Sequence, residues 1–373
     1  CFSSLADQLD ESYADENDDY LGEFYGSQEM IEIATGIKTQ IYKAPAVASV
    51  ITAEQISRLG ATDIDDVLET VPGLHVSRFS NSYLPIYTFR GVHSIYNAQV
   101  LMLINGIPIT NSFLGNRNQN WLGMPVEGIS RIEVIRGPGS ALYGADAFAG
   151  VINIITKNAD DIGRGELGFR SGSYNTQDAW LSRSITLGEA KLGVVAEYHK
   201  TGGLDKIIES DAQTILDGAF GTNASQAPGK LSLGKESVDL RAELNWHEWT
   251  IRAGLQKRTN GGLGAALGEA LDPEANKASD RYNADVNYLK QVNDDWQISA
   301  QATYFSTTQE IKNNYKIYPE GVDLGAGVFT DGFIGNPEVY ERHYRLNFSG
   351  LYSGIDNHTI KTGAGYHLGD MYK

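Results

Sequence analysis

The sequence has little cysteine and no long apolar run, and acidic residues outnumber basic ones. One cysteine among 373 residues excludes an internal disulfide and a cysteine-rich zinc site. No run of about 18 apolar residues occurs, which excludes a transmembrane helix. The formal net charge is −17, whereas a nucleic-acid partner needs a basic face, so no nucleic-acid partner is expected.

Glycine and tyrosine, in contrast, are abundant. The chain holds 41 glycines, well above the average of about 7%, and 20 tyrosines. With 41% hydrophobic residues, wholesale disorder is excluded. Many turns together with many aromatic side chains indicate a β-rich protein, and the length suggests about two domains.

Residues 1–37 contain no Lys or Arg but many Asp and Glu residues. Such a segment cannot bury enough apolar surface to fold alone, so it is predicted to be a flexible acidic tail. No basic start followed by an apolar stretch is present, which fits a mature chain without a cleavable signal peptide. We interpret Cys1 as an arbitrary start, with a lipidated terminus as the alternative.

Residues 38–159 are predicted to form an α+β unit. Thr52 and Gln55 have the spacing of a capping box, and Gly60 ends the short helix that follows. A second helix is expected from Ile64 to Val71, where apolar residues recur at helical spacing before a Pro-Gly pair. Strands are expected at 99–104, 129–135 and 151–155, and a hairpin turn at residues 105–106.

After about residue 160, apolar and polar residues alternate strictly, as in 238–246, 281–291 and 296–305. About nine strands are expected. Tight turns near 188, 247, 293 and 355 alternate with long connections at 201–236, 259–279 and 311–337. A soluble sheet with one solvent-exposed face also explains the alternation, but it does not explain why the long loops share one edge. The pattern therefore favours a membrane barrel with long loops on one side.

Several segments of the first half occur in a fixed order, at residues 44–56, 67–74, 89–91, 100–108, 129–144 and 150–155. In these segments the chain resembles the plug domain of TonB-dependent outer-membrane receptors. The resemblance implies an α+β plug domain followed by an antiparallel transmembrane β-barrel, which has about 22 strands in the family. The implied domains are an acidic periplasmic tail at 1–37, a plug at 38–159 and the N-terminal part of the barrel at 160–373. Since about nine strands fit into the last segment, we expect a truncated sequence.

The resemblance also implies a TonB box, a short segment that the TonB partner protein binds as an added β-strand. An extended, β-prone run occupies the position where the box is expected, and its residues are Met30, Ile31, Glu32, Ile33, Ala34 and Thr35. The alternative is that this run is the first strand of the plug.

In the family, ligands bind plug loops that face the cell exterior. The positions matching these loops here are Arg78, Tyr83, His93, Tyr96, Asn111, Phe113, Arg117 and Trp121. Aromatic side chains with Arg suit an anionic, partly aromatic ligand such as a ferric siderophore, and His93 could bind haem. Each residue taken singly could instead pack its own loop. The family's pairing of plug residues with the barrel wall makes Arg90, Glu133 and Arg136 candidates for plug–barrel ion pairs, with ordinary surface ion pairs as the alternative.

These features predict TonB-dependent uptake of a scarce nutrient across the outer membrane of a Gram-negative bacterium, with tail and plug facing the periplasm. A ferric siderophore is the first candidate, and haem, cobalamin or a glycan are alternatives. The expected partners are TonB, outer-membrane lipid and a small-molecule ligand. A passive plugged porin, a surface adhesin and an outer-membrane enzyme are the rivals. No catalytic arrangement or paired metal-ligand spacing stands out, so neither an enzyme nor a cofactor or metal site is predicted.

Overall fold

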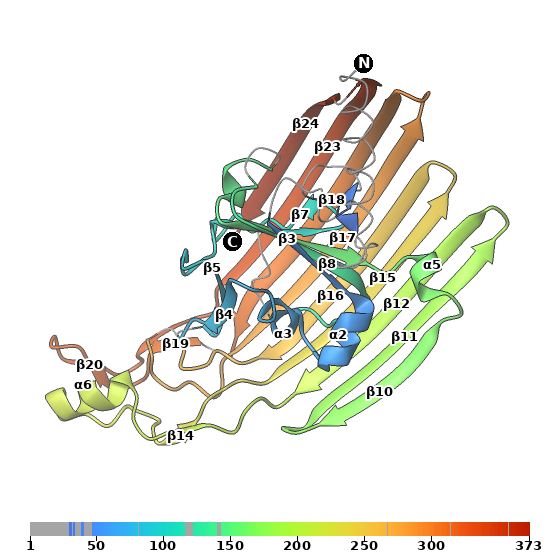
Figure 1. Cartoon of the computed structure of the whole chain (residues 1–373). Helices are drawn as coiled ribbons and strands as arrows, with labels where there is room; N and C mark the ends of the chain where they lie inside the picture. The colour runs from blue at the N-terminus through green and yellow to red at the C-terminus, as the bar shows by residue number, and fades with distance from the viewer. Residues whose placement is uncertain are drawn as a thin grey trace, which may run out of the picture.

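The computed structural model describes residues 47–80, 82–115, 122–139, 143–266, 268–313, 315–356 and 358–373, together with residues 30, 31, 33, 39 and 40. A small α+β domain comes first in the chain, and a long antiparallel sheet follows it (Figure 1). This order is the one predicted for a plug and barrel strands. The small domain lies along one side of the broad sheet (Figure 1). In the described part of the chain, no helix is both long enough and apolar enough to cross a membrane.

A five-stranded sheet forms the centre of the α+β domain. In spatial order its strands are β3 (Ala48–Thr52), β8 (Ile129–Arg136), β9 (Gly150–Thr156), β6 (Val100–Ile104) and β7 (Ile107–Pro108). The β6–β9 pair is parallel and the other pairs are antiparallel. Asn105 and Gly106 form the predicted turn between β6 and β7, with φ angles of 51° and 77°. Apolar side chains from both faces of this sheet form two buried clusters.

The two helices of this domain begin at capping residues. Helix α2 (Ala53–Leu59) has the predicted capping box of Thr52 and Gln55, and Gly60 ends it in the left-handed conformation. Helix α3 (Ile64–Leu68) begins at Asp63, whose side chain accepts a hydrogen bond from the Asp65 N–H. It ends earlier than predicted, because the chain continues in i→i−3 turns through Val71. Val71 is nevertheless buried with the helix face.

Shorter elements complete the domain. Strands β4 (Leu74–Arg78) and β5 (Pro85–Phe89) form a hairpin, and β1 (Met30–Ile31) pairs with β2 (Thr39–Gln40). A 3₁₀ helix, η2 (Ala145–Ala147), precedes β9, and helix α5 (Ala159–Ile162) packs against β11 and β12 of the large sheet.

The large sheet has nine strands in the described part of the chain, as predicted. In spatial order they are β10 (Glu166–Gly172), β11 (Thr176–Leu187), β12 (Ala190–Thr201), β15 (Lys235–Trp246), β16 (Trp249–Gly261), β17 (Asn276–Gln291), β18 (Trp296–Lys312), β23 (Glu338–Ile355) and β24 (His358–Tyr372). Every neighbouring pair is antiparallel. The sheet is therefore a meander, in which each strand pairs with the next strand of this sheet along the chain.

The polar face of this sheet is turned towards the plug, and the apolar face is turned away. On β15, Asp239 is 0% exposed, whereas its neighbour Leu240 is 43% exposed. On β23, Glu341 and His343 are buried, whereas Leu346 is exposed. The alternation seen in the sequence thus places polar side chains inside and apolar side chains outside, which is the arrangement of a membrane barrel.

The two ends of the sheet differ in their connections. At one end, the tight-turn end, strands are joined at residues 188–189, 247–248, 292–295 and 356–357. At the other, the long-loop end, connections at 202–234, 262–275 and 313–337 contain additional elements. These are β13 (Ile207–Ile208), α6 (Ala212–Phe220), β14 (Gly229–Lys230), β19 (Tyr315–Tyr318), β20 (Val322–Asp323), β21 (Val328–Phe329) and β22 (Phe333–Gly335).

Aromatic side chains gather at the tight-turn end. The Trp249 ring lies 4.8 Å from that of Tyr288, and the Trp296 ring lies 4.9 Å from that of Tyr352. Both tryptophans are exposed on the apolar face. Such rings suit the boundary between an apolar and an aqueous phase.

Candidate functional site: an apical cavity and the plug–barrel contacts

A cavity of about 650 Å³ lies between the plug and the long-loop end of the sheet. From the plug it is lined by Phe79, Ser82, Leu84, Tyr96, Phe113 and Leu114. From the sheet and its loops, the lining includes Leu263, Gln309, Ile311, Tyr315, Ile317 and Val339. The volume is in the range of pockets that hold small organic ligands. We call this space the apical cavity.

The plug turn at residues 79–84 forms one wall of the apical cavity. Phe79 and Leu84 are joined by a backbone hydrogen bond of 2.9 Å, which closes the turn. Two side-chain contacts attach it to the barrel side: Lys277 donates to the carbonyl of Ser82, and the Ser80 hydroxyl donates to Glu269 at 3.0 Å. The wall therefore has a fixed position relative to the long loops.

The plug segment at residues 110–114 forms a second wall. Glu341 of β23 accepts hydrogen bonds from the backbone N–H groups of Ser112 (2.7 Å) and Phe113 (3.1 Å). Arg345, four residues further along β23, donates to the Thr110 hydroxyl. One strand of the large sheet thus fixes the backbone that carries Phe113 and Leu114.

Arg78, the first predicted ligand residue, is bound within the plug. Its guanidinium forms an ion pair with Asp65 at 2.7 Å, and its Cζ lies 5.7 Å from the Tyr83 ring centre. Burial raises the pKa of Asp65, as does the neighbouring charge of Asp63, while Arg78 opposes both. The Tyr87 hydroxyl also donates to Asp65 at 2.8 Å. Arg78 thus balances a buried carboxyl.

The other predicted ligand residues divide into three groups. Tyr96 and Phe113 line the apical cavity. Tyr83 and His93 are exposed on plug loops outside the lining, and Asn111 is buried, with its Oδ1 accepting from the Leu114 N–H at 2.8 Å. Arg117 and Trp121 lie outside the described residues. A role in ligand binding remains a prediction for all of them.

Sequence reasoning did not single out the apolar part of the lining. Phe79, Leu84 and Leu114 are close in sequence to predicted residues, whereas Leu263, Ile311 and Val339 come from the barrel side. The one signal available was that the last three lie in or beside long connections.

The segment proposed as the TonB box is described at Met30, Ile31 and Ile33, while Glu32, Ala34 and Thr35 lie outside the described residues. Ile31 and Ile33 are buried in a cluster with Val50, Leu101 and Val151. The Ile33 N–H donates to Glu133 at 3.2 Å. In this conformation Ile31 and Ile33 are packed into the plug.

The residues predicted to form plug–barrel ion pairs have plug partners. Glu133 is buried and pairs with Arg131 at 2.8 Å. Arg136 donates to the carbonyls of Pro72 (2.9 Å) and Ala48 (3.5 Å). Arg90 is exposed, and its backbone N–H donates to the Gly73 carbonyl. A pairing of these three with the barrel wall remains a prediction.

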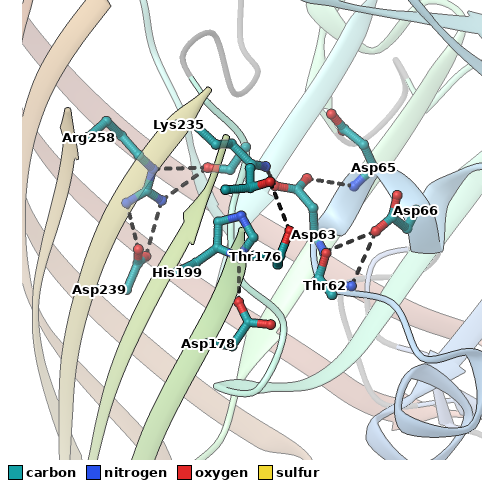
Figure 2. A network of polar contacts seen from close by, with 12 residues as sticks. Thr62, Asp63, Asp65, Asp66, Thr176, Asp178, His199, Lys235, Asp239 and Arg258 are labelled. Atoms are coloured by element: carbon teal, nitrogen blue, oxygen red, sulfur yellow. Dashed lines mark hydrogen bonds and ion pairs between the residues drawn. The ribbon is translucent and has the colours of Figure 1, made fainter. Parts of the chain in front are cut away.

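Other residues join plug and barrel (Figure 2). Lys235 at the start of β15 binds Asp63, the capping residue of α3, at 2.6 Å. The backbone carbonyl of Gly123 accepts from Arg258 Nη2 at 3.0 Å, and Arg258 also pairs with Asp239 at 2.6 Å. Burial by itself would raise the pKa of Asp63, but the charge and hydrogen bond of Lys235, the Asp65 N–H and the charge of Arg78 together lower this pKa.

Residues 122–128 run along the polar face of the sheet, and we call them the strap. A Cβ built on Gly123 would overlap the Asp63 carboxylate, and one on Gly128 would lie 2.7 Å from Arg241 and from Glu197. The carbonyl of Met124 accepts from the Ile64 N–H at 2.9 Å, which ties the strap to α3. Glycine at position 123 therefore permits a close approach to Asp63 within the plug, and glycine at position 128 permits a close approach to the barrel wall.

Titratable side chains do not converge on a metal-binding arrangement in the described residues. No group of three or more His, Cys, Asp and Glu side chains there has the required geometry.

Comparison with known proteins agrees with this architecture. Residues 40–151 match the family model of the TonB-dependent receptor plug domain. The vitamin B12 transporter BtuB of Vibrio vulnificus (strain CMCP6) is 34% identical over 168 residues, which are 43% of this chain and 26% of that protein.

Solved structures show the same fold. A variant of the ferric enterobactin receptor PfeA from Pseudomonas aeruginosa has a TM-score of 0.58 at 21% identity, covering 88% of this chain and 49% of its own. The siderophore receptor PirA from Acinetobacter baumannii has a TM-score of 0.58 at 20% identity, covering 87% and 48%. The chain thus spans about half the length of these structures. The chain thus joins a TonB-dependent receptor plug domain, at residues 40–151, to nine antiparallel strands that have the fold of the barrels of these outer-membrane receptors.

Proposed function

We propose that the protein takes up a small organic ligand across the outer membrane, driven by TonB, with a ferric siderophore as the first candidate. The apical cavity is the observation that carries this proposal, because it lies where plug loops and long barrel loops meet. The plug lies on the polar face of the strands, so a bound ligand must pass a displaced plug to cross the barrel. Similarity to the vitamin B12 transporter BtuB, the ferric enterobactin receptor PfeA and the siderophore receptor PirA supports transport of this kind.

Coupling to TonB through residues 30–35 requires Ile31 and Ile33 to leave their buried positions in the plug. Ile31 and Ile33 are both buried, and fully exposing an Ile side chain costs about 1.5–3 kcal/mol. Strand pairing with the partner protein would offset part of this cost, since it supplies new main-chain hydrogen bonds. The run is therefore held when the partner is absent and can be released when it binds.

Deletion of residues 29–35 tests the coupling. We expect ligand binding to the purified receptor to be unchanged and energy-dependent uptake by cells to be lost. A seven-residue deletion within the tail, at residues 15–21, is the matched control and should leave both intact. Uptake that survives the 29–35 deletion would instead support a passive plugged porin or an adhesin.

The choice between ligands is open to a growth experiment. A strain lacking the receptor gene is supplied with a single source of iron, haem or cobalamin, and then complemented. Restored growth on a ferric siderophore alone supports the first candidate. Equal growth on every iron source would remove it, and a requirement for haem, cobalamin or a glycan would assign the receptor to that ligand.

A further inference from the structure

The charge of the ligand can be inferred from the apical cavity, and this inference rests on the proposed uptake function. The described residues that line the cavity include no Asp, Glu, Lys, Arg or His. Its walls are mainly aromatic and aliphatic, with the neutral polar side chains of Ser82, Gln309 and Asn336 between them. A site built for an anion would present a cation or several N–H donors.

Of four cationic side chains near the cavity, three have acidic or backbone partners and the fourth lies over an aromatic ring. Arg78 pairs with Asp65 at 2.7 Å, and Lys312 pairs with Glu310 at 2.8 Å. Lys277 is buried and donates to the Ser82 carbonyl. Lys373 is exposed, and its Nζ lies 4.9 Å from the centre of the Phe113 ring. An anion in the cavity would lose its hydration without gaining a dedicated counter-charge, which is unfavourable.

One buried polar atom of the lining has no partner. Gln309 on β18 is 4% exposed, and its amide oxygen accepts no hydrogen bond in the structure. A buried acceptor without a donor is costly, and a ligand that brings a donor removes that cost. The Gln309 oxygen can therefore accept a hydrogen bond from a ligand that carries an N–H or O–H group.

We propose that the apical cavity receives an uncharged, largely apolar metal chelate that donates a hydrogen bond to Gln309. The aromatic and aliphatic walls bind its organic surface, and the Gln309 oxygen orients it. Specificity against anionic chelates then follows from the missing counter-charge and not from the shape of the cavity.

Two synthetic Fe³⁺ chelates on one amide-linked tripodal scaffold test the proposal. One carries three hydroxamates and is uncharged, and the other carries three catecholates and is triply negative. Binding to the purified receptor is measured by quenching of intrinsic fluorescence. We expect the uncharged chelate to bind at least about tenfold more tightly.

Replacing Gln309 tests the orienting contact. Gln309→Leu keeps the approximate volume and should weaken binding of the uncharged chelate about three- to tenfold. Gln297→Leu, on the same strand near the tight-turn end, is the matched control and should leave the affinity unchanged. Circular dichroism and thermal unfolding establish that both variants are folded.

Three results would overturn the proposal: equal or tighter binding of the catecholate, no binding of either chelate, or an affinity unaffected by Gln309→Leu. These measurements do not involve TonB. A receptor that binds the anionic chelate and still takes it up in a TonB-dependent manner would therefore refute the inference and leave the proposed function intact.

Discussion

Asp63 shows how one side chain can serve two parts of the molecule. It caps α3 in the plug, and it binds Lys235 of the barrel at 2.6 Å. No local pattern could have revealed the second role, because the two residues are 172 positions apart. The capping role, in contrast, is visible in the sequence, since it depends on the residues that immediately follow Asp63.

The lowered pKa of Asp63 makes the stability of the receptor depend on pH. A lowered carboxyl pKa stabilises the folded state fully above the ordinary value of 3.8, and this contribution is lost as the pH falls through the lowered value. Asp63→Asn preserves a capping side chain but leaves Lys235 without its counter-charge. We expect thermal unfolding at neutral pH to show a loss of about 3–5 kcal/mol.

Below pH 3.8 the difference between Asp63→Asn and the unmodified protein should shrink. The matched control is Glu54→Gln, which breaks an exposed ion pair with Arg58 on α2. A surface pair contributes about 0–1 kcal/mol, so this variant should change little. A difference for Asp63→Asn that is independent of pH would contradict the assignment.

At the scale of elements, local signals were predictive and long-range contacts were not. The capping box of α2 and the Asn105-Gly106 turn were both predicted, because each is set by two to four neighbouring residues. The plug–barrel contacts depend on which strand faces which plug segment, and this register is not encoded locally. For this reason Arg90, Glu133 and Arg136 were singled out, whereas the strap at 122–128 was not.

Gly123 in the strap and Gly106 in the β6–β7 turn have similar backbone conformations, but we expect their substitution by alanine to have different effects on stability. Gly123 and Gly106 have φ angles of 67° and 77°, so alanine at either position would adopt a left-handed backbone conformation with similar strain. A Cβ at Gly106 meets nothing within 4 Å, whereas one at Gly123 overlaps Asp63. We expect Gly106→Ala to cost about 1 kcal/mol and Gly123→Ala to cost clearly more.

The measurement is thermal unfolding combined with limited proteolysis of the plug. Gly123→Ala should increase cleavage within the plug, because the clash separates the strap from Asp63 and from the wall. Equal effects of the two substitutions would show that the close approach at Gly123 contributes nothing beyond backbone strain.

At the scale of the whole molecule, the sheet has opposite chemical faces. The strict alternation predicted these faces correctly, because the side-chain period of a strand is two. The apical cavity was only partly foreseen: Tyr96 and Phe113 were predicted, but the apolar side chains that join them come from distant loops. Its lack of charged lining among the described residues could not be read from the sequence, in which Arg78 seemed available.

Replacing one outward-facing apolar side chain by a charged one tests whether the apolar face lies in lipid. Leu346 is exposed near the middle of β23, and Leu346→Arg would place a charge in the hydrocarbon at a cost of about 2–4 kcal/mol. We expect less folded receptor in the outer-membrane fraction of cells. Asn347→Arg, one residue further and on the opposite face, is the matched control and should insert normally. Equal recovery of both variants would argue against a lipid-facing Leu346.

The close fit of the strap against the wall at Gly128 has a consequence for the proposed transport cycle. The wall offers several charged groups, including Lys235, Arg258 and Arg241, and a displaced plug could pair with them in more than one alignment. The contact of Gly128 with Arg241 and Glu197 leaves no room for a side chain, so it favours the one alignment in which a glycine faces the wall at this point. In the proposed transport cycle, this contact would guide a displaced plug back to the same resting position.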